Sequence, residues 1–373
     1  MNKAVKKILL VQLFSNGDCL YATTVARQIK NDYPDCELTW AIASFCKDII
    51  SLNPYVDHIR VVNDVPKNDN KSFRKFKKKV FSEKAEGIWD EVFVTSNMDN
   101  NQALYDGTIR GMVLRAYPHK ITVPLQSVLV LSEKEKNNVA AFSQKNNLID
   151  FKNVILWEYA PQSGQSQLSF DLVMRLSKQL ILIPSTCMIL SSANAFQSTD
   201  QIIDASVLSV RENAALSHYC SLLIGCSSGI TWLCTSSAGK MLPMIQLLNP
   251  YTAFINAPSV DFTRYNINTD HLIEMTSIDE EKIYECVKIV IEKSFSTARE
   301  KYNQPLPLQF NTTRKVVYNM LCYLQFGAIL KHVKIMVSVY GFNLEFLKQL
   351  FLAIITAPFK LISNLYTKKA IKL

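Results

Sequence analysis

The sequence predicts an α/β protein of two consecutive halves, each built from short apolar strands that alternate with helices. Residues 7–14 (KILLVQLF) form a nearly continuous apolar run, a glycine turn follows, and residues 19–31 then show a helical pattern. The same alternation starts again near residue 154. With 373 residues, 48 % of them hydrophobic, the chain is long enough for two domains and can give each a core. We therefore expect two Rossmann-like domains facing each other across a cleft.

The first half alternates strand and helix patterns throughout. Apolar runs predict strands at residues 7–14, 37–43, 58–62, 91–95 and 128–131. Helical spacing predicts helices at residues 19–31, 44–52, 103–117 and 133–146. The last of these follows a capping box formed by Ser132 and Glu135. The polar stretch after it, at residues 147–152, is the expected domain boundary.

The second half repeats this alternation and ends in a helical tail. Strands are predicted at residues 154–157, 180–183, 187–190, 221–224 and 244–248. Helices are predicted at residues 168–178, 211–219, 230–237 and 277–302, the last opened by a capping box at Ser277. Residues 312–369 are expected to be mostly helical. The predicted domains are residues 1–148, residues 149–303, and a basic helical tail at residues 304–373.

The loop after the first strand carries the sharpest functional candidate. Ser15, Asn16, Gly17 and Asp18 follow the strand directly, and the carboxyl ends of parallel strands are where open α/β folds place their ligands. A carboxylate at this edge can take a proton from a hydroxyl group as a general base. The alternative is that Asp18 only caps the following helix, since Asp is common at that position.

Two loops of the second half have the residue types that hold phosphate groups. Gly225-Cys226-Ser227-Ser228-Gly229 follows an apolar strand and opens a helix, so its backbone N–H groups can bind phosphate oxygens. The loop with Ser163, Gly164, Gln165 and Ser166 offers hydroxyls, an amide and a glycine for the same purpose. The alternatives are a plain strand-to-helix turn for the first loop and a surface loop for the second.

The charge distribution predicts an anionic partner. The formal net charge is +9, which suits nucleic acid, a phosphorylated glycolipid or a membrane surface. Nucleic-acid motifs with aromatic platforms are not evident, which disfavours nucleic acid. Residues 67–84 hold eight Lys or Arg against two acids, and the last 43 residues hold seven Lys against Glu345. Arg74, Lys75, Lys77, Lys78 and Lys79 are the candidate patch for an acceptor or a membrane.

Both basic regions also have ordinary interpretations. The run at residues 67–84 is typical of a solvated helix face. In the tail, apolar and basic residues alternate, which suits one helix packed back across the domains and another lying on the inner surface of a membrane. Domain packing alone is the alternative. The most apolar late stretch, residues 350–359, is well short of the roughly 20 residues that span a bilayer, so no transmembrane helix is expected.

Missing motifs narrow the chemistry further. No G-x-G-x-x-G follows the first strand, so a nicotinamide or flavin enzyme is disfavoured. There is no D-x-D and no His or Cys cluster at metal spacing, so we expect metal-independent chemistry with no cofactor. Nine scattered cysteines without a C-x-x-C pair indicate reduced, buried thiols in a cytoplasmic protein.

The order of three motifs resembles the heptosyltransferase family, glycosyltransferase family nine. S-x-G-D follows the first strand, Y-P-D precedes the second, and N-P-Y-V-D precedes the third. The segment at residues 225–232 looks like the family's donor-side G-x-D-[ST]-G-x-x-H. Ser227 stands where the family has an acid that holds donor sugar hydroxyls, and Trp232 stands where it has His. Both departures argue against heptose as the sugar.

The resemblance implies a GT-B glycosyltransferase with an active site between an acceptor-binding and a donor-binding domain. Asp18 would be the base of an inverting displacement, and the loops at residues 163–166 and 227–229 would hold the diphosphate of a nucleotide sugar. The acceptor would be a lipopolysaccharide-type or other anionic surface glycan, and the protein would be cytoplasmic, peripheral on the inner membrane face. A nucleotide-sugar epimerase and a catalytically silent glycan-binding scaffold are the alternatives.

Overall fold

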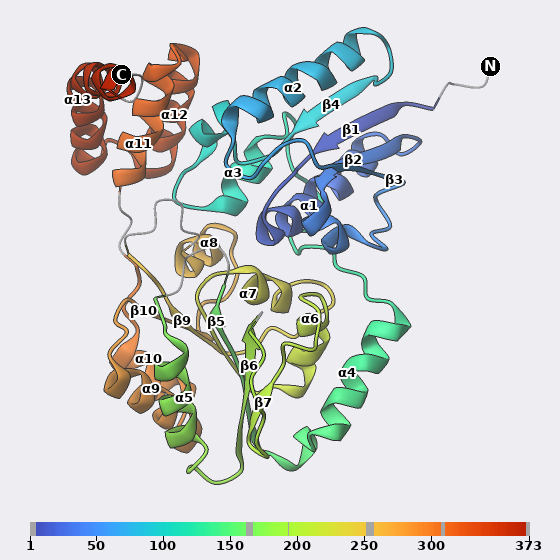
Figure 1. Cartoon of the computed structure of the whole chain (residues 1–373), viewed down its shortest axis with the longest axis vertical. Helices are drawn as coiled ribbons and strands as arrows, with labels where there is room; N and C mark the ends of the chain where they lie inside the picture. The colour runs from blue at the N-terminus through green and yellow to red at the C-terminus, as the bar shows by residue number, and fades with distance from the viewer. Residues whose placement is uncertain (1–4, 162–166, 193, 251–256, 307–309, 371–373) are drawn as a thin grey trace.

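A computed structural model describes residues 5–161, 167–192, 194–250, 257–306 and 310–370, with side chains up to Phe359 in the last helix. The chain forms two parallel sheets, one above the other in Figure 1. The first sheet has the order β3-β2-β1-β4, with β1 Lys7–Val11, β2 Glu37–Ala43, β3 His58–Val62 and β4 Glu91–Val94. The second has the order β10-β9-β8-β5-β6-β7, with β5 Asn153–Ala160, β6 Thr186–Ser192, β7 Ile202–Asp204, β8 Leu222–Gly225, β9 Met244–Leu247 and β10 Leu272–Met275.

Helices cover the faces of both sheets. The first sheet is accompanied by α1 Asn16–Asp32, the 3₁₀ helix η1 Ser44–Ile50, α2 Asn70–Ala85, the 3₁₀ helix η2 Asp99–Leu104 and α3 Ile109–Arg115. The second is accompanied by α4 Glu133–Lys145, η3 Leu148–Asp150, α5 Phe170–Leu180, α6 Glu212–Leu216, η4 Ser217–Tyr219, α7 Gly229–Cys234, α8 Pro258–Arg264, α9 Glu280–Glu292 and α10 Phe295–Tyr302. The tail consists of α11 Asn311–Cys322, α12 Phe326–Tyr340 and α13 Leu344–Ala370.

Each sheet has one point where the strand order reverses. In the first sheet this point lies between β1 and β4, and in the second it lies between β5 and β8. Ligands of open parallel sheets bind outside the carboxyl ends of the strands at such a point. The loop after β1, the end of β5 and the loop after β8 are therefore the three positions at which a site is expected.

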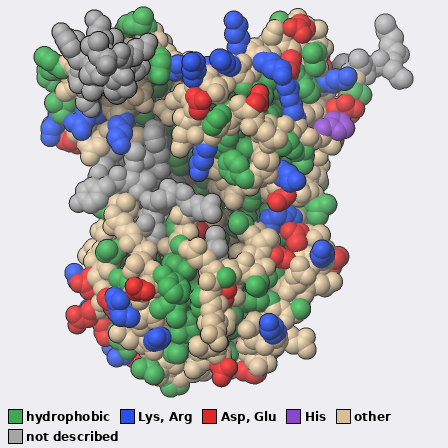
Figure 2. All heavy atoms as spheres, in the orientation of Figure 1, with side chains coloured by type: hydrophobic (Ala, Val, Ile, Leu, Met, Phe, Trp, Pro, Cys, Tyr) green, Lys and Arg blue, Asp and Glu red, His purple; other side chains and the backbone are tan. Residues whose placement is uncertain are grey.

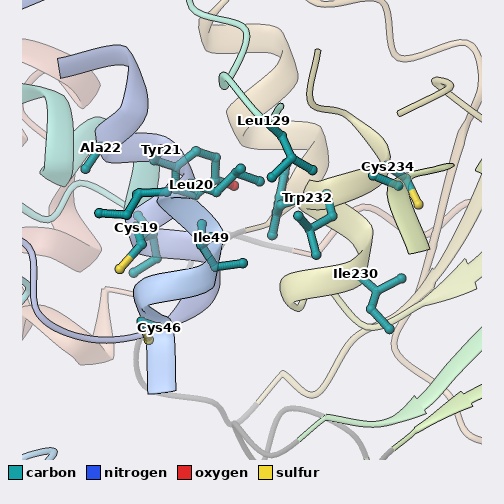
Figure 3. Packing of buried hydrophobic residues seen from close by; sticks show 14 of the residues in the cluster. Cys19, Leu20, Tyr21, Ala22, Cys46, Ile49, Leu129, Ile230, Trp232 and Cys234 are labelled. Atoms are coloured by element: carbon teal, nitrogen blue, oxygen red, sulfur yellow. The ribbon is translucent and has the colours of Figure 1, made fainter. Parts of the chain in front are cut away.

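The core is continuous across the two halves. One cluster of buried residues combines α1 and β2 of the first half with α6 and α7 of the second. Two further clusters lie on the remaining faces, one on each sheet. Figure 3 shows the first of these clusters where the two halves meet, with Tyr21 of α1 and Trp232 of α7 close together. The two halves thus share an apolar seam beside the predicted cleft.

Two predicted strands are wrong. Residues 128–131 are extended but pair with no strand, because side chains satisfy their backbone: Thr23 accepts from the Val128 N–H at 2.8 Å and Ser237 from the Leu129 N–H at 3.0 Å. Residues 180–183 form the end of α5 and a turn. The short strands β7 and β10 were not predicted.

Three predicted helices differ in detail. The helix at 103–117 begins only at Ile109, because Gly107 has φ 98° and the Thr108 hydroxyl caps the Gly111 N–H. Residues 44–50 are a 3₁₀ helix. The helix at 277–302 is two helices, and Asp279 rather than Ser277 caps the first of them. The capping box at Ser132 and Glu135 is confirmed.

Two segments connect the halves. Helix α4, which precedes the predicted boundary at residue 148, contacts the second half: Asn138 donates to Glu212 at 2.9 Å and Arg211 pairs with Glu135 at 2.6 Å. The tail lies against the first half, where His332 contacts the Ala103 carbonyl at 3.0 Å. The division into three domains at residues 148 and 303 stays a prediction.

All nine cysteines are free thiols, as the sequence predicted, and eight of them are buried. Among the helices that the structure describes, none combines the length and the hydropathy that a bilayer span requires.

Candidate active site

The two reversal points face each other across the seam. A Cβ placed on Gly229, at the start of α7, would lie 3.7 Å from the Cβ of Asn16, and one placed on Gly17 would lie 3.7 Å from Cδ1 of Trp232. The loop after β1 and the loop after β8 are therefore in van der Waals contact. The structure brings together Ser15–Asp18 and Ser227–Gly229, the sequence's candidates from opposite halves.

Asp18 is the third residue of α1 and is partly buried. Burial raises the pKa of its carboxyl group from 3.8 to about 7, although the positive charge of Lys67 opposes this rise. The N-cap position belongs to Ser15, and in the part of the chain that the structure describes no group donates a hydrogen bond to the Asp18 carboxylate. These features fit a carboxylate kept for proton transfer better than a helix cap.

The loop before Asp18 is held in an uncommon backbone conformation. Ser15 has φ 67°, in the left-handed region that non-glycine residues rarely adopt. Its carbonyl accepts the Cys19 N–H at 2.9 Å, which begins the helix without a side-chain cap. Oδ1 of Asn16 is buried and has no hydrogen-bond partner among the described residues. An orphaned acceptor beside a strained residue is a feature that functional sites often show.

The loop after β8 is fixed from beneath by Gln246. The Ser227 N–H donates to Oε1 of Gln246 at 2.7 Å, and Ser227 also has positive φ, at 57°. A Cβ on Gly225 would lie 2.5 Å from Oγ1 of Thr231, so only glycine fits there. Ser227 and Ser228 are both buried, whereas Gly229 is partly exposed. Both serines of this loop are thus shielded from solvent.

Glu158 is a site residue that sequence reasoning missed. The polar loop was expected to begin at residue 158, but β5 continues to Ala160 and carries Glu158 inward at its carboxyl end. The Ser228 hydroxyl donates to Oε1 of Glu158, and the Ile230 N–H approaches the same oxygen at 3.5 Å. Burial raises the pKa of this carboxyl group. A charged residue inside the apolar run VILWEYA is the signal that could have identified it.

Trp232 packs between the two halves at the apolar seam. Its indole N–H donates to the Ser227 carbonyl at 3.3 Å, and its ring lies 5.3 Å from that of Tyr21 in the first half. The guanidinium of Arg110 lies over the rings of Tyr21, Trp232 and Tyr265, at 4.9, 5.9 and 5.5 Å from their centroids. Trp232 therefore acts in packing between the halves, and it offers no titratable group.

The predicted basic patch divides into two sets on α2. Arg74 and Lys77 both pair with Asp99, at 2.7 and 3.5 Å, and Arg74 also stacks on Tyr323 of the tail. Lys75, Lys78 and Lys79 are exposed, and Figure 2 shows Lys and Arg side chains along this upper edge of the molecule. Ser163, Gly164, Gln165 and Ser166 lie outside the described residues, so their predicted role stays a prediction.

Comparisons with solved structures confirm the fold. A glycosyltransferase family nine protein from Veillonella parvula is 16 % identical with a TM-score of 0.53, covering 81 % of this chain and 96 % of that one. An ADP-heptose lipopolysaccharide heptosyltransferase II from E. coli is 14 % identical with a TM-score of 0.50, covering 76 % and 98 %. No protein-family model and no curated protein matches the sequence. The predicted GT-B architecture and the resemblance of the fold to family nine transferases are thus confirmed.

Proposed function

We propose that this protein is an inverting, metal-independent glycosyltransferase that uses a nucleotide-diphosphate sugar as co-substrate. One observation carries the proposal: Asp18, whose pKa is raised by burial, lies at the reversal point of the first sheet, and the loop that leads to it contacts the loop at the reversal point of the second. Asp18 removes the proton from an acceptor hydroxyl while that oxygen attacks the anomeric carbon. The bond from this carbon to the diphosphate breaks, and the nucleoside diphosphate leaves.

The first half, which contains Asp18, would bind the acceptor, and the second half would bind the donor. We propose an anionic glycolipid or surface glycan of the lipopolysaccharide type as acceptor, because exposed Lys75, Lys78 and Lys79 lie on the same half as the base. The donor is a heptose-like or other nucleotide sugar. The chemistry needs no cofactor besides this co-substrate.

An epimerase is the second candidate, and the structure offers one observation in its favour. Asp18 and Glu158 come from opposite halves, and burial raises the pKa of both carboxyl groups. Two such groups can serve as an acid and a base on a nucleotide sugar. An epimerase keeps the sugar on the nucleotide, whereas a transferase releases the nucleoside diphosphate only when an acceptor is present.

Calorimetry with nucleoside diphosphates separates both enzymes from a silent scaffold. We expect one of ADP, UDP, GDP or CDP to bind, with a dissociation constant on the order of micromolar to millimolar as is typical of enzyme substrates. The same ligand should raise the melting temperature, because it binds only the folded protein. Absence of heat and of a melting shift across the whole set would favour the scaffold and contradict the transferase.

Membrane association of the acceptor side is part of the proposal, and α13 supports it. Its inner face is buried through Phe346, Ala353 and Ala357, yet its outer face is also apolar. Leu344, Phe351 and Phe359 on that outer face are 82 %, 63 % and 70 % exposed. The spacing of 7 and 8 residues places these three on one stripe of the helix.

The positive charge of the exposed lysines favours an anionic bilayer as the partner that covers this stripe. Lys331 and Lys334 of α12, the helix that precedes α13, are exposed, and so are the three lysines of α2 named above. The tail and α2 are neighbours, because Tyr323 stacks on Arg74 and Gln325 donates to Asp99 at 3.2 Å. An apolar stripe flanked by lysines binds the boundary of an anionic membrane.

Sedimentation with vesicles tests this surface. We expect the Phe351→Ser/Phe359→Ser double variant to lose at least about tenfold in partitioning onto phosphatidylglycerol vesicles, since each buried Phe contributes roughly 1.5–3 kcal/mol. Ile149→Ser is the matched control, because Ile149 is exposed but lies in the second half. Equal partitioning of the double variant and wild type, or a change of oligomeric mass in the double variant, would show that the stripe does not bind membrane.

A further inference from the structure

Two buried oxygen atoms, both from residues that contact the start of α7 or the loop before it, have no hydrogen-bond partner among the described residues. They are Oε2 of Glu158 and Oδ1 of Asn16. Glu158 is only 5 % exposed, so its second oxygen has lost its contact with water and gains no hydrogen bond that offsets the cost. Its first oxygen is fully used by Ser228 and Ile230. A buried acceptor left open in this way requires a structural or functional explanation.

The two oxygens belong to the same small region. Glu158 is bound by Ser228 and Ile230, the residues on either side of Gly229. Asn16 is the residue of the other half that meets Gly229, with the Cβ approach of 3.7 Å given above. Glu158 lies near the end of β5 and Asn16 begins α1 after the loop that follows β1, so both residues are at the reversal points of their sheets. Beside the loop after β8, each half therefore contributes one unused acceptor, and Nε2 of Gln246 beneath this loop is a buried donor that also has no partner among the described residues.

The unused acceptors indicate which chemical group of a nucleotide sugar can bind here. A diphosphate offers only acceptor oxygens and negative charge, so a carboxylate repels it. In the described residues no group of three or more His, Cys, Asp or Glu side chains could hold a metal ion. Sugar hydroxyls are uncharged and both donate and accept hydrogen bonds, and a buried carboxylate oxygen is a strong acceptor for them.

We propose that Glu158 binds hydroxyl groups of the sugar of the nucleotide-sugar donor, with Asn16 as an additional acceptor from the facing half. The inference rests on the proposed function, because it assigns the sugar part of that site. Ser228 and the start of α7 hold the carboxylate in place by binding its other oxygen. The diphosphate lies elsewhere in the site, away from Glu158.

Binding of matched ligand pairs tests this assignment by calorimetry. The pairs are ADP with ADP-glucose, UDP with UDP-glucose, and GDP with GDP-mannose, and the informative quantity is the affinity gained by adding the sugar. We expect Glu158→Gln to lose about tenfold or more of that gain, the size of one hydrogen bond to a charged group. Its affinity for the diphosphate alone should stay unchanged or rise, because a negative charge is removed.

Glu212→Gln is the matched control. Glu212 is also buried in the second half, but Asn138 and the Ser209 N–H bind its two oxygens at 2.9 and 2.6 Å. This variant should keep the gain from the sugar. Ser228→Ala, which frees the Glu158 carboxylate, should lose part of the gain, and it provides a second test if Glu158→Gln does not fold.

The outcomes separate this inference from the proposed function. If Glu158→Gln binds the diphosphate normally and keeps the full gain from the sugar, Glu158 does not bind the sugar. If it weakens diphosphate and nucleotide sugar equally, Glu158 only supports the loop after β8. If the wild-type protein binds no nucleoside diphosphate at all, the proposed function fails and the inference fails with it.

Discussion

Replacement of Asp18 by Asn should slow sugar transfer by about 10²–10⁴-fold, the contribution of a well-placed general base. The amide keeps the size of the side chain but cannot take the acceptor proton. Affinity for the nucleoside diphosphate should change little, because the base acts on the acceptor. The measurement is the steady-state rate of nucleoside diphosphate release, with donor binding by calorimetry as the control. A wild-type rate in a folded Asp18→Asn protein would exclude Asp18 as the base.

If Asp18 is the base, its raised pKa also predicts how the rate of sugar transfer depends on pH. The base is active when ionised, so kcat/KM of the wild type should rise about tenfold per pH unit up to about pH 7 and then level off. The sign for stability is opposite: a carboxyl pKa raised on folding means that ionisation disfavours the folded state, so Asp18 costs stability above its unfolded pKa. Asp18→Asn should therefore be at least as stable as wild type at pH 8.

This pH dependence distinguishes lost chemistry from lost folding. A thermal melt of both proteins at pH 8 measures their stability, and the rate is then compared between pH 5.5 and 8.5. A wild-type profile that is flat over this range would show that no group with a pKa near 7 controls the reaction. An Asp18→Asn variant that melts well below wild type would assign Asp18 a structural role instead.

Replacement of Arg110 by Met should destabilise the fold by about 3–5 kcal/mol, since it removes the ion-pair partner of the buried Asp261 carboxylate and leaves only the more distant charge of Arg264. Arg110 of α3 and Asp261 of α8 join the two halves with an Nη2–Oδ2 distance of 3.1 Å, and both side chains are almost completely buried. Beyond this ion pair, neither oxygen of Asp261 accepts a hydrogen bond from the residues described. The free energy of unfolding in urea at pH 8 is the measurement.

The double variant Arg110→Met/Asp261→Leu should recover most of that loss, because an apolar pair can replace a buried ion pair at little cost. Lys136→Met is the control for a surface pair, since Lys136 and Glu133 are exposed, and it should change stability by less than about 1 kcal/mol. The pKa of Asp261 is already raised to about 6 by burial. The loss in Arg110→Met should therefore be smaller at pH 5, where Asp261 is protonated, than at pH 8. Equal losses at both pH values, or no rescue in the double variant, would contradict this account.

Much of the fold could be predicted because its strands are apolar runs bounded by turns. The strands at 37–43 and 58–62 match β2 and β3, and the runs at 7–14 and 91–95 contain β1 and β4. The strand β7 has only three residues, and in β10 (LIEM) the apolar run is interrupted by Glu274. Residues 128–131 have the apolar pattern of a strand, but their backbone partners are side chains from remote segments.

The site was predictable only where local sequence determines it. Asp18 follows a strand and a glycine turn, so its position at the sheet edge could be inferred. Glu158 was missed because the strand was taken to end at its first charged residue. The roles of Trp232 and Arg110 depend on partners from the other half, which no local pattern reveals. The division of the basic residues on α2 likewise depends on Asp99 and Tyr323, which the fold brings to Arg74 and Lys77.

The central claim, sugar transfer with Asp18 as base, is tested most directly by nucleoside diphosphate release with and without acceptor. The donor is the nucleotide sugar selected by calorimetry, and the acceptor is a glycolipid extract from a bacterium that lacks a complete outer core. We predict release that depends on the extract in wild type and is about 10²–10⁴-fold slower in Asp18→Asn. Conversion of the donor sugar without release, or equal release by the two proteins, would contradict the transferase mechanism.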